Sequence, residues 1–234
     1  MTAISYALRA GDPARVATPL LAVLLPAEPS VPRALAALDR VYGGLLSRAI
    51  RQRDFRGGRD ETLLLLRPGA GGGPERVLLV GMGTAEAVKG MHRAAAIAGR
   101  RANGMGVGAM ALWAQEFGGA ALEGAVAGSA LGAWVFRDLQ AAPPPAQRRK
   151  PLTRVTCVVA NATAAAKAAL TAGAAVAEGQ RLARHLGMLP GNLCTPEHFA
   201  RTARDIAKRH RLKVSVMGRR EMTRLKMGSF LAVA

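Results

Sequence analysis

Residues 18–53 read TPLLAVLLPAEPSVPRALAALDRVYGGLLSRAIRQR, and this stretch decides the expected fold class. Residues 18–25 form a near-continuous apolar run with turn residues on both sides, which predicts a strand buried on both faces of a sheet. Residues 31–53 then place apolar side chains at helical spacing, at Leu35, Leu38, Val41, Leu45, Leu46 and Ile50. A buried strand followed by such a helix is typical of an α/β layer structure, so we expect that class.

The alternation of strands and helices continues along the chain. Residues 62–66 and 76–80 are short apolar runs separated by a loop rich in glycine and proline, which indicates a hairpin. Two further segments, residues 85–101 and 120–136, are predicted to be helices. This order supports a layered α/β structure.

A proline-rich segment, AAPPPAQRRK at residues 141–150, separates two regions. Proline removes hydrogen-bond donors and fixes an extended backbone, so the segment is either a linker or a long surface loop within one domain. Beyond it, residues 153–160 predict a strand, and residues 163–189 have the length and alanine content of one long helix. We expect a weak point in that helix at Gly173 or Gly179, because glycine is a poor helix former.

The last third of the chain contains a strong helix start at Thr195, Pro196 and Glu197. Thr195 can cap the free amides, Pro196 suits the first helical position, and Glu197 complements the helix dipole. Three more elements are expected after this helix: a strand at residues 212–217, a short helix at 220–226 and the beginning of another strand at 229–234.

The chain is strongly basic. Of its 234 residues, 33 are Lys or Arg and 15 are Asp or Glu, which gives a formal net charge of +18. A surface this basic attracts polyanions without regard to sequence, so we expect nonspecific affinity for nucleic acid. The composition is also rich in Arg, Ala and Gly, as a GC-rich coding bias produces. The charge alone therefore does not assign a nucleic-acid function.

Several features indicate a cytoplasmic protein. The first residues, MTAISYALRAGDP, have no basic region followed by a sustained apolar run, so we expect no signal peptide. No apolar run reaches the 18 residues typical of a membrane span. The two cysteines, Cys157 and Cys194, are too few for a disulfide framework or a cysteine-based metal site. We therefore expect a reducing compartment and no membrane contact.

Five motifs occur in one order along the chain. They are LDRVYGGLLSRAIRQRDFRGGRDETLLLL at residues 38–66, RVLLVGMG at 76–83, EGAVAGSALGAWVFRDL at 123–139, ARHLGMLPGNLCTPEHFARTARDIAKRH at 183–210 and LKVSVMGRREMTRLKMGSFLAVA at 212–234. Each alone is a weak signal, but in this order they resemble the leucyl aminopeptidase (cytosol aminopeptidase) family. The resemblance covers most of residues 38–234.

The resemblance implies a fold and an activity. It implies a macro-like α/β domain at residues 1–162, a linker helix at 163–190 and the start of a metallo-exopeptidase domain at 191–234. The family's enzymes are hexamers that remove N-terminal residues from peptides. They use two divalent metals, usually zinc, manganese or magnesium, which lower the pKa of a bridging water and make it a nucleophile.

The family's catalytic chemistry is expected to lie outside this sequence. A two-metal site needs several converging carboxylates, yet from residue 190 onward the acidic residues are Glu197, Asp205 and Glu221, without ligand spacing. The family's segments G-K-x-x-x-F-D-x-G-G and D-x-x-N-T-D-A-E-G-R are both absent. We therefore assign no catalytic, cofactor-binding or metal-binding residue. We expect a truncated portion of the peptidase, inactive alone and without bound metal.

Other motifs favour plain structural interpretations. Gly81-Met82-Gly83 follows a predicted strand, as in dinucleotide-binding folds, but the third small residue of that pattern is replaced by Glu86. The four histidines lack the spacing of metal ligands. Cys194 has no base close in sequence, so a buried structural thiol is preferred over a reactive one.

The second hypothesis is a noncatalytic binding module. Residues 181–226 carry twelve basic and three acidic residues, and Arg201, Arg204 and Lys208 share one face of a predicted helix. That face is either simply solvated or a surface that tracks phosphates. A basic module for nucleic acid, or an α/β cleft for a nucleotide-like ligand, is therefore the alternative function. A structural partner within hexamers is a third.

Overall fold

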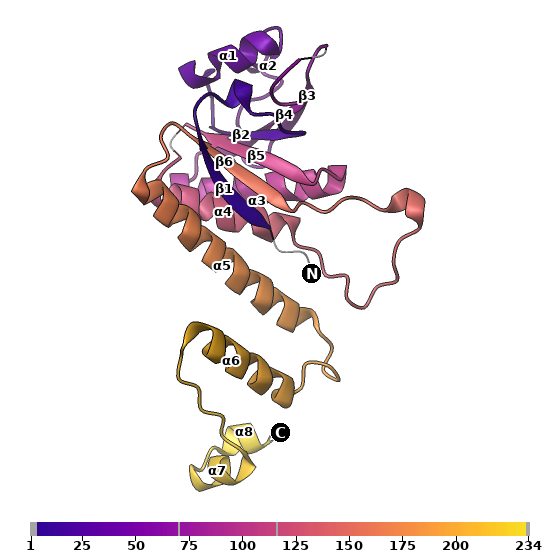
Figure 1. The fold of residues 1–234 in the computed structure, drawn as a ribbon, viewed down its shortest axis with the longest axis vertical. Coiled ribbons are helices and arrows are strands. Elements are labelled where there is room, and N and C mark those ends of the chain that lie inside the picture. Colours follow the sequence, from indigo (N-terminus) through magenta and orange to yellow (C-terminus); the bar gives the residue numbers. More distant parts are fainter. Residues whose placement is uncertain (1–3, 70, 116, 233–234) are drawn as a thin grey trace. The chain divides into compact units, whose positions relative to one another are not determined.

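The computed structural model describes residues 4–69, 71–115 and 117–232, which form two compact units, Met1–Arg184 and His185–Ala234 (Figure 1). The first unit contains a six-stranded sheet of order β1-β6-β5-β2-β4-β3. The strands are β1 (Ser5–Ala10), β2 (Leu21–Pro26), β3 (Thr62–Leu66), β4 (Arg76–Gly83), β5 (Ala109–Ala114) and β6 (Arg154–Val159). Every neighbouring pair is parallel except β3 with β4. The predicted α/β class and the β3–β4 hairpin are therefore confirmed.

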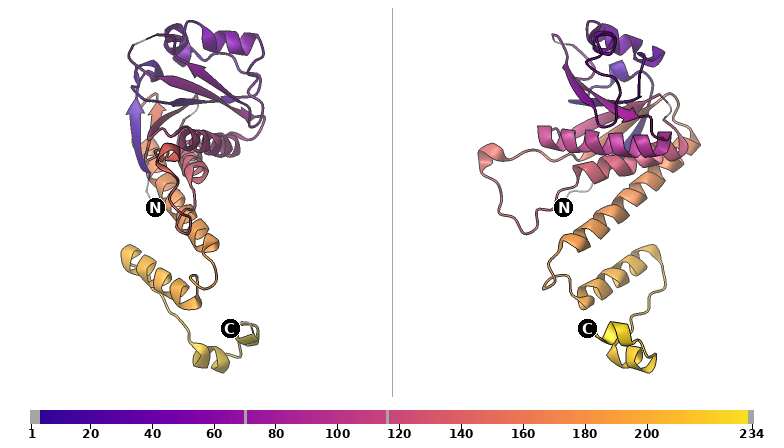
Figure 2. Two further views of the ribbon diagram at one scale, coloured as in Figure 1. Left: turned by 90° about the vertical axis from the view of Figure 1, so that its right-hand side faces the viewer. Right: turned by 180° about the vertical axis from the view of Figure 1, so that it is seen from behind.

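Helices cover both faces of this sheet, which explains the apolar run of β2. Leu21, Val23 and Leu25 pack with α1 (Ala36–Val41) and α2 (Leu45–Arg51) on one face. Ala22 and Leu24 point to the other face, where α3 (Ala87–Met105) and α4 (Gly119–Ala133) close a second core. Successive strand residues point to opposite faces, so a strand buried on both sides must be apolar throughout. Figure 2 shows the sheet between the two helical layers.

The single long helix predicted after β2 is interrupted in the structure. Gly43 and Gly44 take left-handed backbone conformations, with φ of +61° and +76°, and end α1. The Asp39 carboxylate then accepts hydrogen bonds from the amides of Leu46 and Ser47 at 3.0 and 3.1 Å, which caps α2. Apolar residues keep helical spacing across the break, so periodicity alone predicts one helix.

The proline-rich segment is a loop within the first unit, because β6 returns to the same sheet between β1 and β5. The loop contains a short 3-10 turn at Pro145–Gln147 and is fixed at its end by two hydrogen bonds. The Leu152 amide donates to Asn103 Oδ1 at 3.2 Å, and the Thr153 hydroxyl donates to the Gly108 carbonyl at 3.0 Å. Two other 3-10 turns lie at Pro13–Arg15 and Arg33–Leu35.

Helix α5 (Ala164–Met188) confirms the predicted long helix, but the predicted weak point is wrong. The helix continues through both Gly173 and Gly179. A Cβ atom on Gly173 would lie 2.7 Å from the Glu123 carbonyl oxygen and 2.8 Å from Val126 Cβ, so this glycine lets α5 approach α4 closely. A Cβ on Gly179 would meet open space.

The second unit contains α6 (Pro196–His210), α7 (Arg219–Arg224) and α8 (Gly228–Ala232). The predicted start of α6 is confirmed, because the His198 amide donates to the Thr195 hydroxyl at 3.3 Å. The strand predicted at residues 212–217 is wrong, since these residues have no regular structure. Apolar β-branched residues favour a strand only where a neighbouring strand can pair, and the described part of this unit contains none.

The strand predicted to begin at residues 229–234 is also not observed. Residues 228–232 form α8, and residues 233–234 lie outside the described residues. Across the described ranges, none of the helices combines the length and apolar composition needed to cross a membrane.

Candidate functional site

The three acidic residues of the second unit differ in position and in the contacts they make. Glu197 is in the first turn of α6, where a hydrogen bond from its own backbone amide, then one from the Thr195 hydroxyl, lowers its carboxyl pKa. Asp205 is exposed farther along α6, and Glu221 lies 3.9 Å from Arg224 on α7. Within the described ranges, no three His, Cys, Asp or Glu side chains gather where they could hold a metal ion.

The two cysteines have different surroundings. Cys157 is fully buried in the core between the sheet and α3, and burial raises the pKa of its thiol to about 12. Such a thiol stays protonated and is a poor nucleophile at neutral pH. Cys194 is half-buried rather than buried, which corrects that part of the expectation, and both cysteines are free.

Neighbouring backbone packs against Gly81-Met82-Gly83 at the end of β4, which agrees with the structural interpretation. A Cβ on Gly81 would lie 1.9 Å from the Gly58 carbonyl oxygen. The Gly81 amide donates to the Glu61 carbonyl at 2.9 Å, and the Gly83 amide donates to the Gly57 carbonyl at 3.0 Å. These amides are already paired with the loop around residue 58, so they are not available to a phosphate.

The basic helix face predicted from the sequence is present. Arg201, Arg204 and Lys208 are all exposed on α6, and within the described residues none of the three forms an ion pair. Their spacing of three and four residues places them on one side of the helix. The arrangement can attract phosphates but contains no aromatic side chain for base stacking.

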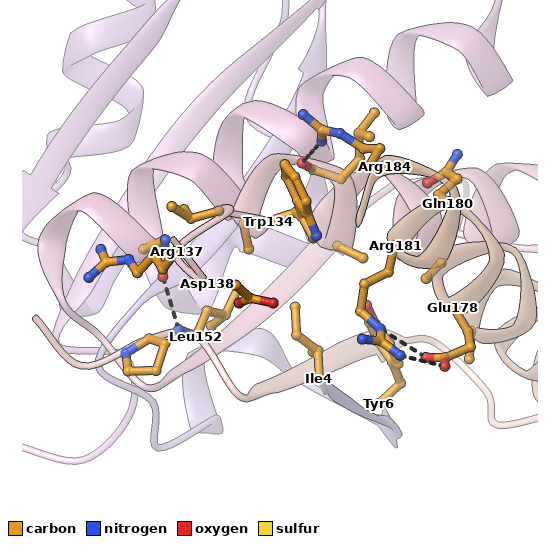
Figure 3. A pocket seen from close by; sticks show the side chains of 18 of the residues that line it. Ile4, Tyr6, Trp134, Arg137, Asp138, Leu152, Glu178, Gln180, Arg181 and Arg184 are labelled. Carbon is orange, nitrogen blue, oxygen red and sulfur yellow. Dashed lines mark hydrogen bonds and ion pairs between the residues drawn. The ribbon is translucent and has the colours of Figure 1, made fainter. Parts of the chain in front are cut away.

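A cavity of about 310 Å³ lies in the first unit between β1, the end of α4 with the loop that follows it, and α5. Its wall joins residues as distant in sequence as Ile4 and Arg184 (Figure 3). Apolar residues line much of the cavity, and they include Ile4, Ala130, Ala133, Leu152, Ala174 and Ala177. A cavity of this size falls at the lower end of the range for small-molecule sites.

Trp134 stands at the centre of the cavity wall (Figure 3). The Arg184 guanidinium carbon lies 4.3 Å from the centroid of its ring, within cation–π range. Arg184 also donates to the Leu131 carbonyl at 2.9 Å, so one side chain of α5 holds the end of α4. The indole nitrogen of Trp134 is closed off from solvent and has no hydrogen-bond partner within the described residues.

The remaining polar wall carries charges of both signs. Four arginines and two carboxylates line the cavity: Arg137, Arg149, Arg181, Arg184, Asp138 and Glu178. Arg181 and Glu178 form an ion pair at 2.6 Å one turn apart on α5. The hydrogen bonds that Arg181 donates to the Glu178 carboxylate raise the pKa of Arg181, which keeps the guanidinium charged. The wall therefore has an excess of positive charge.

Tyr6 of β1 supplies a second polar group that is shielded from solvent. Its hydroxyl has no hydrogen-bond partner in the described part of the chain, and burial raises its pKa to about 12. Ser129 is close enough to offset part of that rise, but its own hydroxyl donates to the Val126 carbonyl at 2.8 Å. The geometry between Tyr6 and Ser129 is not that of a hydrogen bond, so the Tyr6 hydroxyl stays unpaired.

The sequence does not identify this cavity. Arg181 and Arg184 belong to the basic stretch at residues 181–226, whereas no sequence motif marks Tyr6 or Trp134 as part of a site. The three-residue spacing of the two arginines places them on one face of α5, which is the one signal that points to the wall. The other residues meet there only because β1 lies beside β6 in the sheet.

Comparisons with known proteins find two consecutive family matches. Residues 22–143 match the model described as "Cytosol aminopeptidase family, N-terminal domain". Residues 181–234 match the model described as "Cytosol aminopeptidase family, catalytic domain". The two matches have the same order as the motifs quoted above.

Bacterial relatives extend the similarity along most of the chain. A probable cytosol aminopeptidase of Cupriavidus pinatubonensis is 40% identical over 223 residues, covering 84% of this chain and 41% of the relative. One from Azoarcus sp. is 33% identical over 243 residues, covering 99% of this chain and 48% of the relative. The chain thus spans less than half the length of these relatives.

A solved structure agrees in fold. A mutant of tomato leucine aminopeptidase matches with a TM-score of 0.83 and 23% sequence identity, covering all of this chain and 48% of the tomato chain. At this identity the match concerns the fold alone.

Proposed function

This chain belongs to the cytosol aminopeptidase family, and from that premise we propose that it forms the N-terminal portion of a metallo-exopeptidase that releases N-terminal amino acids from peptides. The observation that carries the proposal is the order of the two family matches along one chain, the N-terminal domain before the catalytic domain. In this proposal residues 1–162 are the macro-like domain, residues 163–190 the linker helix and residues 191–234 the opening of the peptidase domain.

The reaction in the whole protein would use two divalent metals, manganese or zinc, to activate a water molecule. The residues described here do not fit such a pair, because no three potential ligands gather at one place within the described ranges. Glu197 is engaged at a helix start, and Cys157 is buried in the core. We therefore propose that residues 1–234 alone do not hydrolyse peptides.

The packing of the second unit supports its role as part of a larger domain. Of its described residues only Ala207 is buried. Large apolar side chains are instead exposed, with Phe199 at 52%, Leu212 at 60% and Phe230 at 62%. A unit this small cannot stabilise itself without a core, so these side chains need a further surface to cover them. We propose that the rest of a peptidase domain supplies it, in a cytoplasmic hexamer.

Hydrolysis of leucine p-nitroanilide tests the proposal. The purified chain of residues 1–234 is expected to show no chelator-sensitive hydrolysis with manganese or zinc. A protein extended to the length of the bacterial relatives is expected to hydrolyse the substrate and to lose this activity with a chelator. Chelator-sensitive activity of the short chain, or inactivity of the long one with either metal, contradicts the proposal.

The native mass gives an independent test. An antibody against the first unit would capture the protein from its source cells for intact mass measurement. The proposal expects about twice the 24.4 kDa of this chain, as the coverage of the relatives implies. A mass of 24.4 kDa favours the noncatalytic binding module instead.

Nucleic-acid binding is the second candidate function, favoured by the exposed basic face of α6. Replacing Arg201, Arg204 and Lys208 with Gln should weaken binding to a labelled duplex. The dependence of log affinity on log salt should also become shallower, by about one for each phosphate that is no longer neutralised. A control with the exposed Arg33, Arg40 and Arg51 changed to Gln removes the same charge elsewhere. Equal effects of the two triple variants would mean that only net charge matters.

A further inference from the structure

The cavity beside Trp134 has the features of a small-molecule site, independent of any peptidase chemistry. It lies wholly within the first unit, and of the described residues in the segment matched to the catalytic domain only Arg181 and Arg184 line it. Its lining residues come from β1, α3, α4, the loop after α4 and α5, so an occupant can contact several segments at once. The sign of the charges and the apolar wall together indicate the chemistry of that occupant.

Donors predominate on the polar part of the wall. Arg137 and Arg149 line the cavity without an ion pair within the described residues, whereas Glu178 is already held by Arg181. Arginine guanidinium groups recognise carboxylates and phosphates through paired N–H donors. The four arginines outnumber the two carboxylates, Asp138 and Glu178, so this wall favours an anionic group over a cationic one.

The apolar part of the wall sets the rest of the ligand. Ile4 and Leu152 line the cavity together with alanine side chains of α4 and α5, and the Trp134 ring adds a large flat surface. Small residues on the two helices leave room instead of filling it. Burial of an apolar body here gains roughly 25 cal/mol for each Å² removed from water.

Among the described residues that line the cavity, three buried polar atoms have no hydrogen-bond partner, and two of them can donate to an anion, the third being the acceptor Gln180 Oε1. The Trp134 indole N–H and the Tyr6 hydroxyl are closed off from water and have no partner within the described ranges. A buried polar group left unpaired destabilises the protein. A small rotation of either ring would let its donor reach an acceptor in the cavity. An occupant with carboxylate or phosphate oxygens can therefore form a hydrogen bond that an apolar occupant cannot.

We propose that this cavity binds a small organic anion, a carboxylate or a phosphate ester, with a compact apolar or aromatic body. Arg137 and Arg149 bind the anionic group, and the wall around Ile4 and Leu152 binds the body. The site is noncatalytic, and it stands whether or not the whole protein is a peptidase, because its residues make no use of a metal. A neutral molecule of the same shape binds more weakly, since it leaves the guanidinium groups without a counter-charge.

Tryptophan fluorescence measures the binding directly. The chain has two tryptophans, and Trp113 lies in the opposite core, so the Trp113→Phe variant leaves Trp134 as the sole reporter. Three probes share one ring: phenylacetate carries a carboxylate, phenyl phosphate carries a phosphate ester, and phenylacetamide is neutral. Excitation at the red edge of tryptophan absorption avoids the phenyl ring, and circular dichroism checks that the variant is folded.

The proposal expects a saturable change in Trp134 emission with phenylacetate, phenyl phosphate or both, at up to millimolar concentration. The probe that binds more tightly shows whether the site prefers a carboxylate or a phosphate ester. Phenylacetamide should bind at least about tenfold more weakly, the loss typical of one charged hydrogen bond. Saturation by neither anion, or equal binding of phenylacetamide, overturns the proposal.

Paired charge variants locate the site. Arg137→Gln with Arg149→Gln should weaken anion binding by about tenfold or more. The control Arg33→Gln with Arg51→Gln removes two exposed arginines at the other side of the sheet and should leave binding unchanged. Equal weakening by both pairs would mean that the anion responds only to the overall positive charge, and the site assignment would be wrong.

Discussion

Arg184 on α5 covers one face of the Trp134 ring, with its guanidinium carbon 4.3 Å from the ring centroid. The same side chain donates a hydrogen bond to the Leu131 carbonyl at 2.9 Å. The last carbonyls of a helix lack partners within the helix, so a basic side chain from a neighbouring helix is well placed to satisfy one of them. Arg184 therefore fastens α5 to the end of α4 and shapes the cavity wall.

Removal of this cation should be measurable as a modest loss of stability. Arg184→Gln takes away the charge above the ring and is expected to lower the free energy of unfolding by about 0.5–1 kcal/mol, because the side chain is exposed. Urea unfolding followed by Trp134 fluorescence in the Trp113→Phe background measures the change. Arg201→Gln on the exposed face of α6 serves as the control and should have no effect on the unfolding of the first unit.

Two glycines of α5 should respond to alanine in opposite directions. Gly173→Ala places a Cβ 2.7 Å from the Glu123 carbonyl oxygen, so the variant should lose about 1–3 kcal/mol through overpacking. Gly179→Ala meets open space and should gain about 0.5–1 kcal/mol, because alanine is the better helix former. Thermal unfolding of the two variants is a matched comparison. Equal stabilisation by both would mean that α5 does not pack closely on α4.

The central strand β2 is predictable from the sequence because burial on both faces leaves an unbroken apolar run. The edge strand β1 is missed because only every second residue faces the core: Tyr6 and Leu8 are partly buried, while Ser5, Ala7 and Arg9 are exposed. This alternation is the signal that could have found it. Strand β5, at Ala109–Ala114, is missed although it is a short apolar run between helices.

Errors in the second unit have a different cause. The sequence LKVSVM at residues 212–217 alternates apolar and polar residues and contains two valines, which gives it strand propensity. This propensity leads to a strand only where a partner strand can pair. The cavity could not be predicted for a related reason, because Tyr6 and Arg184 become neighbours only through the strand order β1-β6 and the return of α5 across the same face. Long-range topology of this kind leaves no local pattern.

Two tyrosines whose hydroxyl groups are shielded from solvent should respond differently to removal of the hydroxyl. The Tyr42 hydroxyl donates to the Pro74 carbonyl at 3.0 Å, so Tyr42→Phe leaves a buried acceptor unpaired and should cost about 1–3 kcal/mol. The Tyr6 hydroxyl has no partner within the described residues, so Tyr6→Phe should be neutral or slightly stabilising. Urea unfolding of both variants at pH 7 makes the comparison. A large loss in Tyr6→Phe would reveal a hydrogen bond to Ser129.

The same residues predict a loss of stability at alkaline pH. Burial raises the pKa of both Tyr6 and Tyr42 from 10.0 to about 12. Because the folded pKa lies above the unfolded one, the contribution of each group is fully present below pH 10 and is lost as the pH rises toward 12. Tyr6→Phe should therefore show a shallower fall in stability across this pH range than the unmodified chain. An identical fall in the two proteins would mean that Tyr6 is not shielded from solvent.

Hydrogen exchange should separate the two units of the chain. Amides of β2, β4 and β5 lie in a core with both faces covered, and their opening requires unfolding of the sheet. Amides of α6, α7 and α8 belong to a unit whose described residues include only one buried side chain, Ala207, so local opening there exposes little new apolar surface. Mass-spectrometric exchange of residues 1–234 is therefore expected to show fast exchange in these helices and slow exchange in the three strands.

In a protein extended to the length of the relatives, α6 should become protected as its apolar face is covered. Strong protection of α6 in the short chain already would mean that the unit is stable without a further domain.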